Sequence, residues 1–166
     1  GKYHVEAVDL MYSVCDVASN HVQRVLDTKQ IKENSTVPQA VEDAIALICR
    51  NLDITKIVAI TISGYAARLI AAHRPSQPIL AVSNDPMAAR SFNLIYGTEG
   101  IYMDLTFPKN STDHVIVCLE NLWRDGKIVN DDLILVTAVG FPNKGNRMNL
   151  IQTHSVSDLV EVMSWK

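Results

Sequence analysis

The sequence lacks any apolar run long enough to cross a membrane. A spanning helix needs about 20 consecutive, mostly apolar residues, whereas the richest apolar stretches here are the short segments 57–62 and 133–139. Residues 1–5 also lack both an initiating methionine and the charged-then-apolar layout of a signal peptide. We therefore expect no membrane partner, and we regard the chain as a piece cut from a longer protein.

An excess of positive charge is missing as well. The 15 Lys and Arg residues are outnumbered by 18 Asp and Glu residues, which gives a formal net charge of -3. The basic residues are scattered along the chain, whereas a nucleic-acid-binding domain carries a clustered basic face that contacts phosphates. We therefore expect no nucleic acid as a partner.

Cysteine is scarce. The chain has three, Cys15, Cys49 and Cys118, an odd number at wide spacing, whereas small secreted domains carry an even-numbered disulfide framework. Each cysteine stands among apolar neighbours. We therefore expect reduced thiols in the core of a cytoplasmic protein.

Motifs for metal binding and catalysis are also absent. The five histidines show no ligand spacing, and no cysteine pair accompanies them. No serine lies in a nucleophile-elbow pattern, and the pair Asp131 and Asp132 at a strand start is typical of a turn rather than of an acid/base pair. The sequence thus predicts neither a catalytic residue nor a metal site in this chain.

What the sequence does contain is an alternation of short apolar runs and amphipathic stretches. Its 48% hydrophobic residues fit one soluble globular domain, or a domain with an appendage. Apolar runs bounded by turn residues predict strands at 56–62, 78–82, 101–105, 133–139 and 149–154. Helical spacing predicts helices at 5–26, 40–52, 66–73, 87–96 and 114–125.

This alternation predicts an α/β fold. We expect a three-layer α/β/α sandwich with a mainly parallel five-stranded sheet whose last strand is antiparallel. The polar stretch 27–37 is predicted to be a linker, and the apolar tail 155–166 to dock on the domain or on a neighbouring molecule. Because ligands of such sheets bind at the carboxyl ends of the strands, the segments that follow the strands are the candidate sites.

The strongest local candidate is the corner where the first buried strand runs into a helix. It contains Thr61, Ser63, Gly64 and Tyr65. The N–H groups of a first helical turn are free, the helix dipole favours an anion, and glycine lets the backbone approach it closely. The corner therefore predicts a phosphate site. The alternative is that Ser63 simply caps the helix.

A second candidate is the loop 140–147, which follows the fourth strand. Its residues Lys144, Gly145 and Arg147 combine two cations with a flexible backbone. The loop should lie at the same edge of the sheet as the first corner, where its charges would help to hold an anion. A solvated turn is the alternative, so joint use of both segments by one ligand is a hypothesis.

Four segments resemble the pyruvate kinases. Residues 1–8 resemble the start of the last helix of their catalytic barrel, with His4 as the one departure. Residues 61–75 resemble their effector loop and the helix after it, while 78–86 and 146–154 resemble the next strand and the closing stretch. The four segments occur in the right order and at matching spacing.

The resemblance implies both a division of the chain and a function. Residues 1–27 would be the end of the barrel, and 28–166 the C-terminal α/β domain, which in this family binds sugar-phosphate effectors and forms an interface of the homotetramer. Phosphoryl transfer from phosphoenolpyruvate to ADP, with Mg²⁺ and K⁺, takes place on barrel residues outside this segment. We therefore expect a regulatory and oligomerisation domain that is inactive by itself.

The resemblance also points to the effector site. Thr61, Ser63 and Gly64 match the family's phosphate loop, whereas Ile62 and Ala66 replace residues that are polar in many members. One hydroxyl donor is therefore lost.

The part of the site that would hold a second phosphate departs further. His114 falls near an arginine that grips this phosphate in members regulated by fructose 1,6-bisphosphate, and 143–147 replaces a glycine-rich loop. That response is therefore doubtful. A monophosphate, a different bisphosphate or no effector stay open, because Lys144 and Arg147 offer charge from other positions.

The alternative function is a stand-alone phosphate- or nucleotide-binding protein of the same fold. Residues 1–8 argue against it, since the apolar stripe of a barrel-like helix would need a partner to cover it. The reading frame upstream of Gly1 discriminates the two functions: a barrel-coding stretch supports the pyruvate kinase segment, and a start codon supports the stand-alone protein.

Overall fold

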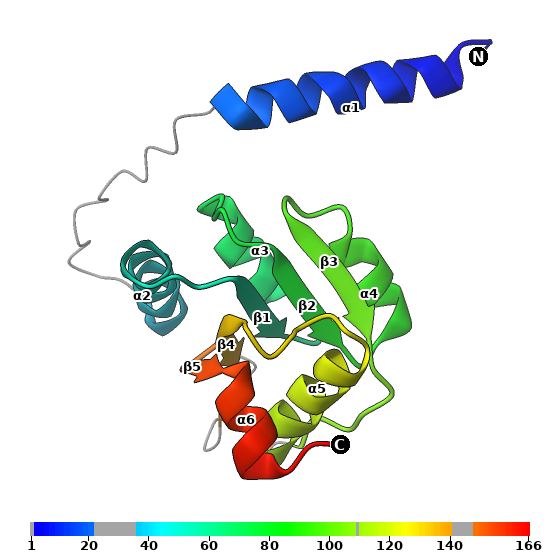
Figure 1. The fold of residues 1–166 in the computed structure, drawn as a ribbon. Coiled ribbons are helices and arrows are strands. Elements are labelled where there is room, and N and C mark those ends of the chain that lie inside the picture. The colour runs from blue at the N-terminus through cyan, green and yellow to red at the C-terminus, as the bar shows by residue number, and fades with distance from the viewer. Residues whose placement is uncertain (1, 22–35, 109, 141–147) are drawn as a thin grey trace. The chain divides into compact units, whose positions relative to one another are not determined.

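The computed structural model describes residues 2–21, 36–108, 110–140 and 148–166 (Figure 1). The chain divides into two units, Gly1–Gln30 and Ile31–Lys166. None of the described helices is long and apolar enough to cross a bilayer.

The described part of the first unit forms one helix, α1 (His4–His21). Its apolar residues, among them Val8 and Met11, are exposed, because no other described element of this unit packs against them. The end of the helix expected over 5–26 lies outside the described residues. Cys15 is exposed on α1, so the prediction that all three cysteines are core residues is wrong for this one.

The second unit is built on a five-stranded sheet. Its strands are β1 (Lys56–Ile60), β2 (Ile79–Ser83), β3 (Thr98–Tyr102), β4 (Leu133–Ala138) and β5 (Leu150–Ser155), in the spatial order β3-β2-β1-β4-β5. The first four strands are parallel to one another, and β5 pairs with β4 in the antiparallel direction. The predicted mainly parallel sheet with an antiparallel last strand is confirmed.

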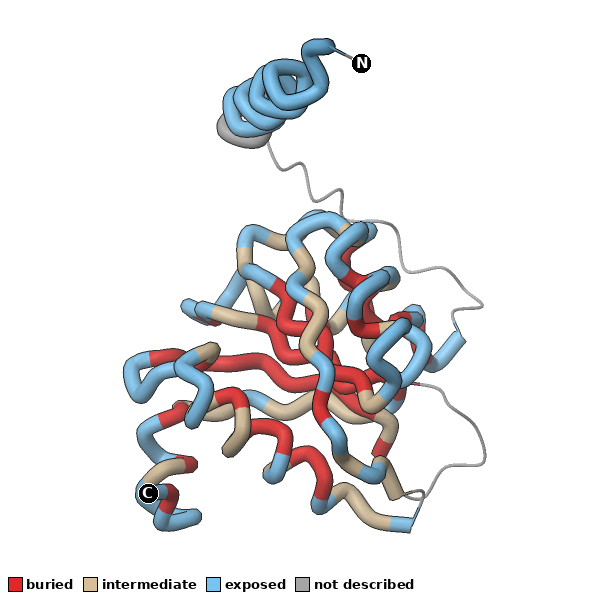
Figure 2. The backbone as a smooth tube through the Cα atoms, turned by 90° about the vertical axis from the view of Figure 1, so that its right-hand side faces the viewer, coloured by how far each residue is buried: buried red, intermediate tan, exposed pale blue. Residues whose placement is uncertain are grey.

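The central strand β1 has side chains that are buried on both faces of the sheet. Its residue Ile57 is in register with Ile79 on one side and Leu135 on the other, and all three are fully buried. A strand covered on both faces has no solvent side for polar residues. This is why β1, β2 and β4 are continuous apolar runs in the sequence. Figure 2 shows the buried backbone segments that run through the middle of this unit.

Helices cover both faces of the sheet, which confirms the three-layer sandwich. On one face lie α2 (Val37–Asn51), α3 (Tyr65–Ala72) and α4 (Pro86–Phe92), and on the other α5 (Asp113–Arg124) and α6 (Val156–Met163). Each layer buries its own hydrophobic cluster against the sheet. The strand ends are therefore left as the open edges of the sandwich.

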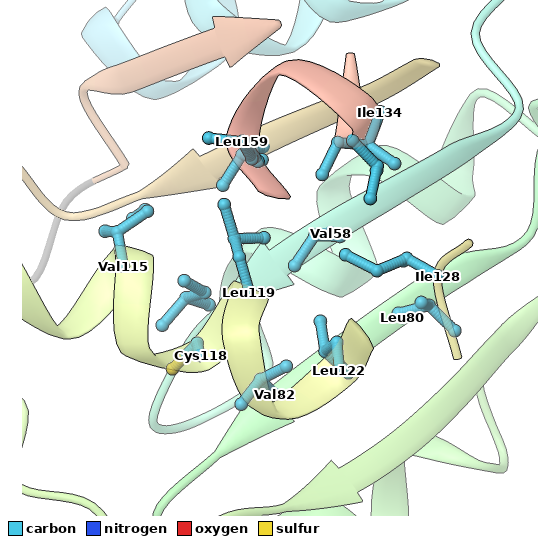
Figure 3. Close-up of a cluster of buried hydrophobic side chains, with 14 of the residues drawn as sticks. Val58, Leu80, Val82, Val115, Cys118, Leu119, Leu122, Ile128, Ile134 and Leu159 are labelled. Carbon is cyan, nitrogen blue, oxygen red and sulfur yellow. The ribbon is translucent and has the colours of Figure 1, made fainter. Parts of the chain in front are cut away.

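The face under α5 and α6 is filled by large aliphatic side chains (Figure 3). Leu119 and Leu122 of α5 point towards Val58, Val82 and the other strand residues and are fully buried. Each such side chain contributes about 1.5–3 kcal/mol of burial free energy. These contacts hold α5 against the sheet.

On the opposite face of the sheet, helix α3 is packed through small side chains of its own. Ala66, Ala67 and Ala71 are buried beside Phe92 of α4, which is itself fully buried. Small side chains let α3 approach the sheet closely. The start of α3 is thereby fixed at the end of β1.

Two neighbouring elements lie several residues away from their predicted bounds. The helix expected over 87–96 ends at Phe92, and the strand expected over 101–105 is β3 at Thr98–Tyr102. The carboxamide oxygen of Asn93 accepts a hydrogen bond from the N–H of Gly100 at 3.1 Å, so the chain turns back earlier than the pattern indicated. As an edge strand, β3 is only partly buried, and its sequence is correspondingly weak as a strand signal.

The tail docks on its own domain as helix α6. Val156, Leu159 and Trp165 are buried in the same cluster as α5, and the Trp165 ring lies 5.8 Å from that of Trp123. The sequence pattern predicts that the apolar tail 155–166 docks, but it does not predict a helix there.

The two cysteines of the second unit are free thiols. Burial raises the pKa of Cys118 to about 12 and that of half-buried Cys49 to about 11. Both therefore stay protonated and unreactive near neutral pH, as expected for packing residues.

Candidate anion-binding site

The candidate site lies at the carboxyl ends of β1 and its two neighbours. β1 is flanked by β2 and β4, which are parallel to it, so the segments that leave these three strands meet at one edge. The helices α3 and α4 begin at this edge directly after β1 and β2. This is where ligands of open parallel sheets bind.

The turn 61–64 joins β1 to α3. The Thr61 N–H donates to the Val82 carbonyl at 2.9 Å, which continues the pairing with β2 beyond the end of the strand. The Thr61 side chain is buried, and its residue is 9% exposed, whereas Ser63 is exposed. The turn thus begins at the buried residue Thr61 and becomes exposed to solvent by Ser63.

Gly64 is the N-cap of α3 and has the left-handed φ of 75°. A Cβ at this position would lie 2.3 Å from Cε1 of Phe92, so both the backbone conformation and the space require glycine. No side chain caps α3. The interpretation of Ser63 as a simple helix cap is therefore wrong.

A row of backbone donors remains free at the turn. Among the described residues, none accepts a hydrogen bond from the N–H groups of residues 62–67. Free N–H groups at a helix start carry a partial positive charge and bind anions. The arrangement that the sequence predicted for a phosphate is thus present in the backbone.

The neighbouring helix α4 offers no such donors. The Asp85 carboxylate accepts hydrogen bonds from the N–H groups of Met87 and Ala88 at 2.8 and 3.1 Å. Its negative charge already complements the helix dipole. Of these two helix starts, only that of α3 is open to an anion.

The second predicted segment emerges beside this turn. Residues 141–147, with Lys144, Gly145 and Arg147, lie outside the described residues. The chain leaves the described part at Gly140, which follows β4. The Gly140 N–H donates to the Asn149 carboxamide oxygen at 2.6 Å, and the Asn149 amide donates back to the Gly140 carbonyl at 3.3 Å. The base of the loop is therefore closed at the edge that also carries the β1–α3 turn.

The remaining residues of the corner are mostly apolar. Tyr65, the first residue of α3, is 44% exposed, and Ile62 is 46% exposed. The donors that the turn offers are thus its main-chain N–H groups and the hydroxyls of Thr61, Ser63 and Tyr65.

His114, near the start of α5, is buried rather than displayed at the site. Its ring lies 5.2 Å from that of Phe107, and its Nδ1 is a buried atom without a hydrogen-bond partner. Burial lowers the pKa of His114, although Asp113 partly opposes this. The imidazole is therefore uncharged near neutral pH and supplies no positive charge for a second phosphate.

Sequence reasoning missed two residues that hold the turn. The Arg68 guanidinium donates from Nη2 to the Ser63 carbonyl at 2.6 Å, and the buried Ser83 hydroxyl donates to the Ile62 carbonyl at 3.0 Å. The Ser83 contact joins residues far apart in the chain. Neither residue stands out in the sequence pattern, since Arg68 lies within the predicted helix 66–73 and Ser83 directly follows the predicted strand 78–82.

Comparison with known proteins identifies the family. A family model described as pyruvate kinase, alpha/beta domain, matches residues 39–154. The chain belongs to the pyruvate kinase family. The matched residues run from within α2 to β5 and so include the whole turn 61–64, while α6 lies beyond them.

Individual pyruvate kinases match at moderate identity. That of Geobacillus stearothermophilus is 30% identical over 165 residues, which cover 96% of this chain and 27% of the relative. That of Borreliella burgdorferi is 29% identical over 169 residues, covering 97% of this chain and 34% of the relative. The chain thus spans about a quarter to a third of the length of these pyruvate kinases.

Solved structures agree with the fold. A crystal structure of a pyruvate kinase from Cryptosporidium parvum superimposes with a TM-score of 0.60 at 22% identity, over 76% of this chain and 24% of that one.

Within the described part of our pyruvate kinase domain, no three His, Cys, Asp or Glu side chains gather into a metal-binding group.

Proposed function

We propose that this chain is the effector-binding and oligomerisation part of a pyruvate kinase. In this proposal residues 1–27 end the catalytic barrel, and 28–166 form the C-terminal domain. The match to the pyruvate kinase alpha/beta domain over 39–154 supports the assignment, as does the small share of each relative that the chain covers. The whole enzyme transfers a phosphoryl group from phosphoenolpyruvate to ADP.

The catalytic ions belong to the barrel in this proposal. Mg²⁺ neutralises the charge on the transferred phosphoryl group, and K⁺ accompanies it, both on residues outside this chain. The enzyme would act in the cytoplasm as a homotetramer to which this domain contributes one subunit interface. The chain alone is then expected to make no ATP.

The proposed effector is a sugar phosphate or a similar small anion. Its phosphate would be bound by the β1–α3 turn and by the loop after β4, through Thr61, Ser63, Gly64, Tyr65, Lys144, Gly145 and Arg147. The observation that carries this proposal is the row of free N–H groups at residues 62–67. A phosphate there would accept hydrogen bonds from N–H groups to which no described residue offers an acceptor.

An effector bound here would act at a distance. An effector shifts activity at a distance by binding one conformational state more tightly than another. In this proposal the two states are quaternary arrangements, so the signal would pass through the subunit interfaces. In this proposal, effector binding and the arrangement of the subunits are therefore coupled.

A panel of sugar phosphates tested by thermal unfolding checks the effector site, because a ligand of the folded state raises the unfolding temperature. Ser63→Ala and Lys144→Ala should each weaken binding by about three- to tenfold, the equivalent of one hydrogen bond or charge contact. Ser76→Ala, an exposed serine that precedes β2 at the other end of the sheet, is the matched control. Unchanged affinity in both site variants would overturn the proposed site.

A further inference from the structure

Three consecutive carbonyls of the β1–α3 turn are each held by a donor. The Ile62 carbonyl accepts from the Ser83 hydroxyl at 3.0 Å, and the Ser63 carbonyl accepts from Arg68 Nη2 at 2.6 Å. The Gly64 carbonyl accepts from the Arg68 backbone N–H at 3.0 Å. Arg68 thus donates two hydrogen bonds to the turn, one from its backbone N–H and one from its side chain.

Holding these carbonyls also fixes the direction of the next N–H groups. In a planar trans peptide the C=O and the following N–H point in opposite directions. With the carbonyls of Ile62, Ser63 and Gly64 turned towards Ser83 and Arg68, the N–H groups of residues 63–65 are turned away from them. These are the same N–H groups for which the described residues offer no acceptor.

The Thr61 side chain gives independent evidence for a ligand at this turn. Thr61 as a whole residue is 9% exposed, and among the described residues its hydroxyl has no hydrogen-bond partner. The hydroxyl oxygen is not among the described polar atoms that are fully enclosed without a partner, of which His114 Nδ1 is the one found. The hydroxyl oxygen is therefore not fully enclosed, and it is available to a bound group.

From these contacts we infer that Arg68 and Ser83 are positioning residues of the effector site, which preorganise the N–H groups of residues 63–65 for a tetrahedral oxyanion such as a phosphate monoester. The inference rests on the proposed function, because it takes the anion at this turn as given. Neither residue has to touch the anion. Their contribution is to remove the cost of ordering the turn when the anion binds.

The two residues act on different peptide units and from different elements. Ser83 is fully buried at the end of β2, and its hydroxyl also accepts from the Asp85 N–H at 3.1 Å, so it ties the turn to the start of α4. Arg68 is exposed on α3. Replacing Arg68 therefore tests positioning without disturbing the core.

The test is the dissociation constant for inorganic phosphate, measured by titration calorimetry on the 166-residue chain and its variants, with urea unfolding of each. Arg68→Ala should weaken binding about tenfold, as expected for one charge-assisted hydrogen bond, with little change in the unfolding midpoint. Arg68→Lys keeps a charged donor for the Ser63 carbonyl and should recover most of the loss. Ser83→Ala should weaken binding about three- to tenfold.

Arg90→Ala is the matched control, because Arg90 is an exposed arginine in the last turn of α4. It removes the same charge from the domain and should leave binding unchanged. If Arg90→Ala weakens binding as much as Arg68→Ala, or if the Arg68 and Ser83 variants bind phosphate like the unaltered chain, the positioning role is overturned while the effector site stands. If the unaltered chain itself gives no saturable phosphate binding, the proposed effector site fails, and the positioning role with it.

Discussion

At the scale of single residues, Gly64 determines the shape of the candidate site. Its left-handed backbone directs the chain from β1 into α3, and Phe92 occupies the space that a side chain would need. The sequence alone indicated a glycine at a strand–helix corner. It gave no sign of the Phe92 contact, which depends on how α4 packs beside α3.

Gly64→Ala is expected to lower the free energy of unfolding by about 2–4 kcal/mol, from the left-handed conformation together with the clash. Gly126→Ala is the control, because Gly126 also has a positive φ of 67° but has open space around it. That variant should lose only about 1 kcal/mol. Urea unfolding checks both, and equal losses would contradict the role given to Phe92.

Asp132 joins the starts of β1 and β4. Its carboxylate pairs with Lys56 and accepts hydrogen bonds from the Thr55 hydroxyl and the Val129 N–H, each at 2.8 Å. Burial acts to raise the pKa of Asp132, but these partners together outweigh it, so the pKa is lowered. The predicted turn at Asp131 and Asp132 is thus also a structural ion-pair site.

The lowered pKa of Asp132 determines how the free energy of unfolding changes in acid. The stabilisation by Asp132 should be complete above the unfolded-state pKa of about 3.9 and should be lost as the pH falls through the lower folded-state value. Asp132→Asn should cost about 2–3 kcal/mol at pH 7 and should lose less further stability than the unaltered chain in acid. Urea unfolding between pH 7 and 2.5 measures this, and parallel curves would contradict it.

His114 predicts a second pH effect, in a different range. Since burial lowers the pKa of His114 and of His154, the unfolded chain binds more protons, and stability should fall as the pH drops below the unfolded-state pKa of about 6.5. His114→Leu removes a buried nitrogen without a partner and should reduce the stability difference between pH 7 and pH 5. An unchanged difference in chemical unfolding would show that His114 does not titrate as described.

At the scale of elements, the sequence predicted the buried strands best. β1, β2 and β4 are continuous apolar runs covered on both faces, so an uninterrupted run of apolar residues is enough to identify each strand. The edge strand β3 and the end of α4 were misplaced because the contact between Asn93 and Gly100 decides where the chain turns. A single side-chain contact of this kind leaves no periodic signal in the sequence.

Helix α6 is an integral part of the domain, although it lies beyond the family match. Leu159 is 8% exposed in the cluster under α5, whereas Val162 on the same helix is 78% exposed. Leu159→Ala should lower the free energy of unfolding by about 2–4 kcal/mol, and Val162→Ala by less than about 0.5 kcal/mol. Similar urea midpoints for the two variants would contradict the packing of α6 on this cluster.

At the scale of the whole molecule, strand–helix alternation was enough to predict the sandwich, while ligand binding at the carboxyl edge of its sheet stays a prediction. Four resembling segments were enough to predict the family. The positioning contacts were not predictable, because the carbonyl of residue 62 meets Ser83 only after β2 has paired with β1. The fold thus follows from local pattern, and the fine geometry of the site follows from tertiary pairing.

The central claim is that an anion binds the free N–H groups at the start of α3. Its most direct test is to titrate the ¹⁵N-labelled 166-residue chain with a sugar phosphate and to follow the backbone amide resonances by NMR. We predict saturable shifts that are largest at Ser63, Gly64 and Tyr65, with no comparable change at the capped start of α4. Saturable shifts centred on another part of the chain, or no shifts at any concentration, would contradict the account.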